Sequence, residues 1–267
     1  MSEFQTREYP RALDHLRHAM ALGMGDHKEM IQSVFYFVAV LLTRFEQYDD
    51  SMQFMIAMVK SGQPTDSLVE PLGLAALRLP LLPSEIPADR RTMIQTAGRA
   101  TLALEAQKRD EAEQILRGLA ASYPNEPGVH FLNGAFLLDV RPEDGIAELK
   151  RELEISPTHV AAKLRLAEQY LKDQKVDLAL ALAQEAAKLE PTHGGAHMVL
   201  GEALVAKGDV AGGIRELEMA QKQLPQTVRI RWDLLRAYSA AGRSDDAKRE
   251  REEIEKLSLP DSGQKSD

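Results

Sequence analysis

Histidine is the residue type in this chain whose spacing first suggests chemistry, because the sequence contains no cysteine. His15 and His18 are three residues apart, and His193 and His197 are four apart, so each pair would share one face of a helix. A zinc site needs three or four ligands with outer-shell support, and each pair supplies only two. We therefore predict surface or helix-capping histidines and no metal site.

Phosphate-binding glycine motifs are also missing. No GxxxxGK segment is present, and no glycine-rich dinucleotide fingerprint follows a credible strand. The pairs Gly194–Gly195 and Gly212–Gly213 fall at expected helix starts, where they favour helix entry and close packing over anion binding. Since no set of polar residues converges as a catalytic pocket requires, we predict no catalytic residues, no cofactor and no enzymatic activity.

The elements that would position these residues follow a repeat. Successive differences along Pro124, Pro157, Pro191, Pro225 and Pro260 are 33, 34, 34 and 35 residues. Between Pro157 and Pro191 the sequence reads as two short amphipathic helices joined by a tight polar turn. A period of this length predicts a stacked array of helical hairpins, each burying its apolar face against its neighbours.

Composition agrees with an all-α fold and narrows the partners. Hydrophobic residues make up 44% of the chain, mostly Ala and Leu, which favour helix. The formal charge of -8 repels phosphate backbones and anionic membranes, so nucleic acid is not an expected partner. The longest apolar run, Val34 to Leu42, is nine residues, too short to span a membrane, and predicts a buried helix. No signal peptide is visible, which leaves both a cytoplasmic and an exported, processed protein open.

Residues 1–88 predict an irregular region of degenerate helix pairs. Helices are expected at about His27–Glu46 and Asp49–Lys60, and another from Thr65 or Asp66 through Leu79. The segment from Pro80 to Pro87 is proline-rich and predicts an extended break in the array, with apolar side chains packed inward. The pattern predicts that the chain begins inside a repeat, and therefore a longer parent array and an uncovered N-terminal helix face.

Residues 89–260 predict five regular helix pairs, and residues 261–267 a disordered polar tail. The expected pairs are 89–106 with 109–122, 127–139 with 143–155, 159–173 with 176–189, 193–207 with 210–223, and 227–241 with 244–257.

Each regular pair repeats three landmarks: a small residue in the first helix, a small residue early in the second, and a closing proline. The sets are Ala100, Ala112 and Pro124; Gly134, Gly145 and Pro157; Ala167, Ala179 and Pro191; Gly201, Gly213 and Pro225; and Leu235, Ala247 and Pro260. This pattern resembles the tetratricopeptide repeat. Leu235 at a small-residue site and Glu152 before Pro157 depart from it. The resemblance implies a right-handed superhelical solenoid of antiparallel helix pairs, about 14 helices in all.

In that family the first helices line a concave groove, so the resemblance implies a groove that binds a protein or peptide. The expected groove is largely apolar, with charges that restrict the choice of partner. Its candidate residues are Phe131, Leu138, Leu164, Arg165, Glu168, Met198, Glu202, Val205, Trp232 and Arg236. For Phe131, Leu138 and Leu164 we also expect that packing against the next hairpin competes with a role in binding. Exposure of Trp232 is the test of its role as an anchor.

Two features exclude special members of the family. The clamp that holds a chaperone C-terminus needs a lysine four residues before an asparagine. The residue four before Asn133 is Val129, and the residue four after Lys163 is Ala167, so neither position completes the motif. A related RNA-binding repeat needs a basic groove, which Glu168 and Glu202 oppose. The leading hypothesis is a non-enzymatic scaffold for protein–protein interaction. The alternatives are an array that self-associates through its N-terminal end, or an accessory part of a larger multidomain protein.

Overall fold

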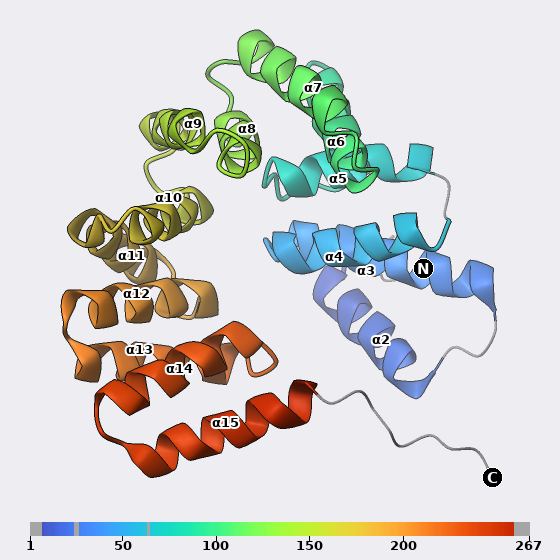
Figure 1. Cartoon of the computed structure of the whole chain (residues 1–267). Helices are drawn as coiled ribbons and strands as arrows, with labels where there is room; N and C mark the ends of the chain where they lie inside the picture. The colour runs from blue at the N-terminus through green and yellow to red at the C-terminus, as the bar shows by residue number, and fades with distance from the viewer. Residues whose placement is uncertain (1–6, 24–26, 63–64, 259–267) are drawn as a thin grey trace. The chain divides into compact units, whose positions relative to one another are not determined.

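The computed structural model of the chain describes residues 7–23, 27–62 and 65–258. It divides into two compact units, Met1–Val140 (unit 1) and Arg141–Asp267 (unit 2), which are described separately (Figure 1). Both are built from α-helices joined by short loops, and no strand occurs among the described residues. The predicted fold class, an all-α solenoid of antiparallel helix pairs, is confirmed, as is the expected number of about 14 helices.

Unit 1 contains seven described α-helices and two short 3-10 turns. They are α2 (Tyr9–Leu22), α3 (Lys28–Arg44), α4 (Tyr48–Lys60), η1 (Thr65–Leu68), α5 (Val69–Ala76), η2 (Pro83–Glu85), α6 (Arg91–Glu105), α7 (Arg109–Ser122) and α8 (Val129–Leu137). The apolar run from Val34 to Leu42 lies in α3, and its last five residues are almost completely buried, as predicted.

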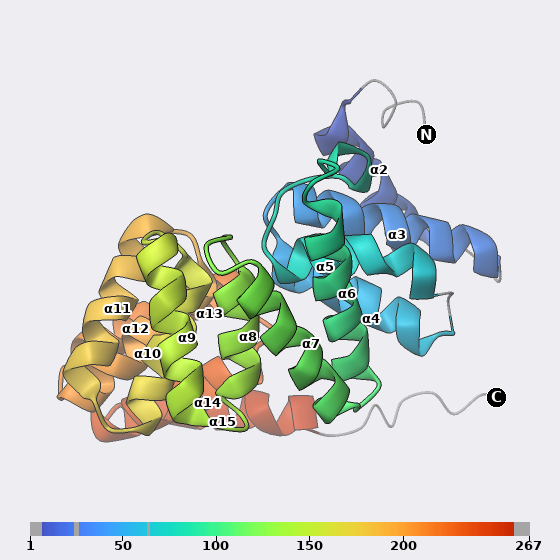
Figure 2. The ribbon, with the colours of Figure 1, turned by 90° about the horizontal axis from the view of Figure 1, so that it is seen from above.

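Unit 2 contains seven described helices of similar length. They are α9 (Pro142–Ile155), α10 (Val160–Lys172), α11 (Val176–Leu189), α12 (Gly194–Lys207), α13 (Val210–Gln223), α14 (Val228–Ala240) and α15 (Ser244–Ser258). From α10 onward, helices that follow one another along the chain lie side by side (Figure 1; Figure 2 gives the view from above). The helix pairs are therefore α10 with α11, α12 with α13, and α14 with α15.

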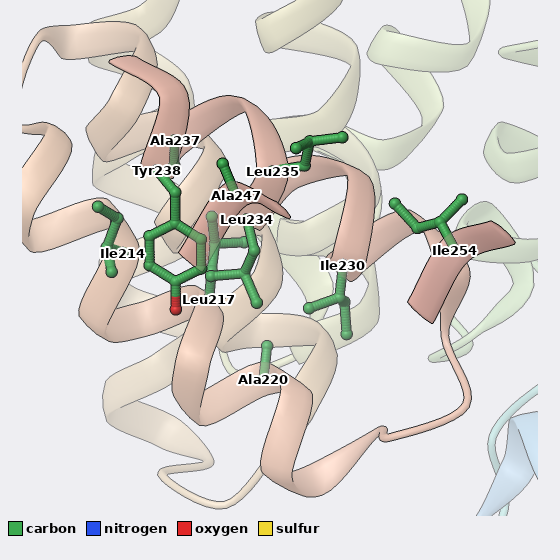
Figure 3. Close-up of a cluster of buried hydrophobic side chains, with 10 residues drawn as sticks. All are labelled: Ile214, Leu217, Ala220, Ile230, Leu234, Leu235, Ala237, Tyr238, Ala247 and Ile254. Atoms are coloured by element: carbon green, nitrogen blue, oxygen red, sulfur yellow. The ribbon is translucent and has the colours of Figure 1, made fainter. Parts of the chain in front are cut away.

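The core of unit 2 follows from the spacing of its apolar residues. Ile214 and Leu217 on α13 meet Ile230 and Leu234 on α14, all at most 3% exposed (Figure 3). These residues recur at three- and four-residue intervals, which places them on one face of each helix. Ile254 on α15 closes the same cluster. Each helix is thus held by its neighbours in the stack, as expected of a solenoid.

Small residues allow the paired helices to cross closely. A Cβ added at Gly201 on α12 would lie 2.7 Å from Leu217 Cγ, and one at Gly213 on α13 would lie 2.4 Å from Val205 Cγ2. In unit 1, a Cβ at Gly98 on α6 would come within 1.9 Å of the Val69 carbonyl oxygen. The repeat pattern marks Gly201 and Gly213 as small-residue sites, but it does not mark Gly98, which meets its neighbour as closely.

A repeated polar contact closes successive helix pairs. The residue six positions after a closing proline contacts that proline's carbonyl oxygen: His197 Nε2 lies 2.8 Å from Pro191 O, and Arg231 Nη2 donates to Pro225 O at 3.3 Å. The same two side chains reach a glutamate on the second helix of their own pair. His197 Nδ1 lies 2.7 Å from Glu216, and Arg231 Nη1 lies 3.1 Å from Glu250. We call this contact set the hairpin latch.

The regular helices begin and end within two residues of the predicted bounds, and the irregular part differs more. The helix predicted through Leu79 ends at Ala76, because Arg78 adopts a left-handed backbone with φ 53°. The proline-rich segment is not extended throughout, since Pro83–Glu85 forms a 3-10 turn. Leu82 and Ile86 are buried there, as predicted.

The predicted division of the chain at residue 88 differs from the two compact units of the structure. The two helices predicted as one pair at 127–139 and 143–155 fall in different compact units. The predicted boundary after residue 88 is not tested by this division. The predicted disordered tail, 261–267, lies outside the described residues.

Candidate protein-binding face

In unit 2, the first helices of the three pairs share an exposed surface. Arg229 on α14 donates from Nη1 to Glu168 on α10 at 2.8 Å. Its Nε and Nη2 donate to the two carboxylate oxygens of Glu202 on α12, at 2.9 and 2.8 Å. One guanidinium therefore joins three helices. We call this surface the first-helix face and define it by Arg165, Glu168, Glu202, Arg229, Trp232 and Arg236.

Glu202 has an unusual electrostatic environment. Its pKa is raised to about 7, chiefly because burial disfavours the charged form, and further because it faces the carboxyl group of Asp233. Arg229 acts in the opposite direction but does not cancel these effects. Burial alone would lower the pKa of Arg229, yet the hydrogen bonds and charges of Glu202 and Glu168 raise it overall. The guanidinium is thus held as a cation between two carboxyl groups.

Two further arginines border this network. Arg236 donates to Asp233 one turn earlier on α14, and Arg165 lies 3.7 Å from Glu168 on α10. Arg165 and Arg236 were both predicted as groove residues, together with Glu168 and Glu202. The structure brings all four to the same face of unit 2. Their function in binding stays a prediction.

Trp232 is the most exposed large apolar residue on this face, with half of its surface accessible. It lies three residues after Arg229 and four before Arg236, so the three side chains emerge from the same side of α14. A fully buried indole would have excluded Trp232 as an anchor. The observed exposure keeps that prediction open.

The other predicted apolar anchors in unit 2 are less accessible. Leu164 is 8% exposed, while Met198 and Val205 are partly buried and pack against the core cluster of α13–α15. These residues therefore contribute to the packing of the first helices. The face that they support is more polar than the largely apolar groove that we expected.

Phe131 and Leu138 belong to unit 1. Phe131 on α8 is 8% exposed, and the guanidinium of Arg78 lies 5.2 Å from its ring centroid. The same guanidinium lies 5.3 Å from the Tyr48 ring and donates to Asp49 at 2.8 Å. Leu138, which caps α8, is partly buried. Phe131 is thus covered by a cation from the turn after α5, a contact that periodicity does not reveal.

Sequence reasoning also missed Arg229, which organises the face. It precedes the groove positions that the family pattern marks, so it was not among the candidates. Its distance of three residues from Trp232 and seven from Arg236 is the signal that places it on the same side of the helix.

The histidines have structural contacts. His193 caps α12 by accepting the Ala196 N–H at 3.0 Å, as a capping role predicts. Gly212 donates its N–H to Asp209 at 2.8 Å, so this N-terminus of α13 is capped within the chain. Among the residues that the structure describes, no group of three or more His, Cys, Asp or Glu side chains could hold a metal ion.

Unit 1 contains a cavity of about 350 Å³ lined by residues of α3, η1, α5, η2 and α6. Glu70, one of two acidic residues that line it, accepts hydrogen bonds from Arg91 at 2.7 Å and Gln95 at 3.0 Å. Tyr36 at its wall has a raised pKa, first because of burial and then because of Glu70. Glu70 is thus already paired with a guanidinium and an amide.

Comparisons with known proteins agree with this architecture. A family model described as "Tetratricopeptide repeat" matches residues 170–230, which run from α10 to α14. Among solved structures, a MamA double mutant (RS-1 ArsTM) is 19% identical and superposes with a TM-score of 0.55, covering 62% of this chain and 93% of MamA. A MamA fragment from Desulfovibrio magneticus RS-1 is 21% identical, with a TM-score of 0.52, covering 65% and 97%. At this identity the likeness concerns the fold.

The remaining comparisons add two facts. No curated protein matches the sequence. In the part of the chain that the structure describes, no helix combines the length and apolarity that crossing a membrane requires.

Proposed function

We propose that this chain, built from tetratricopeptide-like helix pairs, is a scaffold that binds a segment of another protein on the first-helix face of unit 2. The observation that carries this proposal is the exposure of Trp232. A half-exposed indole on an ordered helix presents a large rigid contact surface at a small entropic cost. Stacked helix pairs hold this surface in place before a partner arrives, which favours recognition of a preformed site.

The test compares two exposed apolar residues of unit 2. Trp232 is 50% exposed on α14, and Leu178 is 52% exposed on α11, the second helix of its pair. Trp232→Ala should reduce the recovery of partner in a quantitative pull-down, whereas Leu178→Ala should retain it. Equal recovery with both variants would remove the first-helix face as the binding surface. Circular dichroism of both variants checks that the helices remain folded.

Self-association through the N-terminal end stays a separate prediction. Leu22, at the end of α2, is 74% exposed, and Met30 near the start of α3 is 46% exposed. Static light scattering over a range of concentrations decides this question, because Leu22→Glu should reduce any oligomer that this end forms. The third possibility, an accessory part of a larger protein, also stays open.

A further inference from the structure

We propose that the segment bound by the first-helix face is acidic, with Asp or Glu side chains next to an apolar residue. This inference rests on the proposed function and specifies the chemistry of the partner. It follows from which charged groups on the face are recessed and which are exposed.

The carboxylates of the face are withdrawn from solvent. The side chains of Glu168 and Glu202 are 17% and 15% exposed, and that of Asp233 is 4% exposed. Each is engaged by an arginine of unit 2. A basic side chain of a partner would have to displace an arginine in order to reach them, which makes these acids poor contact points.

The cationic groups, in contrast, reach the surface. The side chain of Arg165 is 57% exposed, that of Arg229 is 50% exposed and that of Arg236 is 73% exposed. Lys172 is also exposed on α10, four residues after Glu168 and therefore on the same side of the helix. An approaching peptide thus meets positive charge first, although the whole chain carries a formal charge of -8.

An arginine that already pairs with one carboxylate still has donors to offer. A guanidinium has five N–H groups, and Arg236 donates from Nη2 to Asp233. A partner carboxylate could therefore bind at Arg236 without breaking the existing contact. Trp232 lies one turn away on the same side of α14, where an adjacent apolar side chain would cover the indole. The face thus matches an acidic residue next to an apolar one.

The sole tryptophan makes this proposal measurable, because fluorescence excited at the red edge, where the six tyrosines do not absorb, reports on Trp232 alone. The probes are two pools of peptides with blocked termini and the same Leu and Phe positions. The acidic pool carries Asp and Glu at the remaining positions, and the basic pool carries Lys and Arg there. The acidic pool should yield binders that change the Trp232 fluorescence. Individual binders are then titrated against the variants.

Arg236→Glu should weaken the binding of an acidic peptide by roughly 10- to 100-fold, as loss of a charge-assisted contact and repulsion both predict. The matched control is Arg249→Glu, because Arg249 forms the same i, i+3 contact to Asp246 on α15 and its side chain is 69% exposed. That variant should bind as the wild type does. Arg236→Gln, which removes the charge without reversing it, should cause a smaller loss and serves if Arg236→Glu fails to fold.

The outcomes of this experiment distinguish a failure of the acidic specificity from a failure of the proposed function. Selection of the basic pool with a change in Trp232 fluorescence would overturn the acidic specificity and leave the proposed function standing. Binders that leave the Trp232 fluorescence unchanged would overturn both. Binding of a single-stranded oligonucleotide that Arg236→Glu abolishes, without binding of acidic peptides, would instead indicate a phosphate-binding surface and overturn the inference.

Discussion

Arg229 on α14 donates two hydrogen bonds to Glu202 on α12, one to each carboxylate oxygen, at 2.9 and 2.8 Å. The two residues are 27 positions apart and belong to different helix pairs. A bidentate pair of this kind fixes orientation as well as distance. It links neighbouring pairs through polar groups, in addition to the apolar core cluster that joins α13 and α14.

The first prediction concerns this link. Arg229→Ala removes the arginine that donates to the recessed carboxyl groups of Glu202 and Glu168, and leaves Glu168 with only Arg165 at 3.7 Å. It should lower the free energy of unfolding by about 1–3 kcal/mol. Arg151→Ala is the control, since Arg151 pairs with Glu154 at 2.7 Å and its side chain is 47% exposed. That surface pair should contribute about 0–1 kcal/mol. Urea unfolding measures both, and equal losses would contradict a special role for Arg229.

The second prediction concerns pH. The pKa of Glu202 is about 7 in the folded chain, above its ordinary value of 4.5. Because the folded state binds this proton more tightly, its contribution to stability is complete below pH 4.5 and is lost as the pH rises through 7. Over this range the loss should reach up to about 3 kcal/mol.

Glu202→Gln isolates this effect, because glutamine keeps the shape of the protonated acid and does not titrate. The difference in unfolding free energy between wild type and variant should change between pH 5 and pH 8, with the wild type relatively less stable at the higher pH. Urea unfolding at intervals of one pH unit gives this difference. Parallel curves for the two proteins would show that Glu202 does not carry a raised pKa.

The third prediction concerns the crossing of α5 and α6. Gly98→Ala would place a methyl group 1.9 Å from the Val69 carbonyl oxygen, a backbone atom, so the helices must separate. We expect a loss of about 1–3 kcal/mol, the usual cost of overpacking. Gly118→Ala on α7 is the matched control, because an added Cβ meets no atom within 4 Å. It should stabilise by up to about 1 kcal/mol through helix propensity. Thermal unfolding should therefore shift in opposite directions.

The fourth prediction concerns Arg78. Arg78→Ala removes the cation between the rings of Tyr48 and Phe131 and the ion pair with Asp49, and it should cost about 1–3 kcal/mol. Arg117→Ala, at an exposed pair with Glu113 on α7, should change stability by less than about 0.5 kcal/mol. Limited proteolysis should also detect faster cleavage near residue 131 in Arg78→Ala. Indistinguishable variants would show that Arg78 is not needed for packing.

The regular helices were predictable because their signals are local. A closing proline ends each pair, and a small residue such as Gly201 marks a close crossing, so bounds after residue 89 agree within two residues. The irregular part was less predictable. The end of α5 at Ala76 depends on the left-handed Arg78, whose conformation is held by partners on α4 and α8.

The candidate site was predictable only in part. The family resemblance placed Glu168, Glu202 and Arg236 on the first helices, and the structure has them on α10, α12 and α14. The resemblance did not reveal that Arg229 pairs with residues 27 and 61 positions away. Side-chain pairing across helix pairs depends on rotamers and exposure, which periodicity does not encode. Leu164 and Phe131 are buried, which agrees with the packing role that the sequence analysis weighed against a role in binding.

The hairpin latch has a consequence for how such a chain can change its length. One latch joins the closing proline Pro191 to His197 and Glu216, all of which come before the next closing proline. The other joins Pro225 to Arg231 and Glu250 in the same way. Each latch is therefore inherited whole when one helix pair is duplicated or deleted. The Arg229 network is not, because its three members come from three pairs. Duplication of one helix pair would thus preserve the contacts within each hairpin, but it would move the residues of the first-helix face apart. Such a change would alter partner binding more than it alters folding.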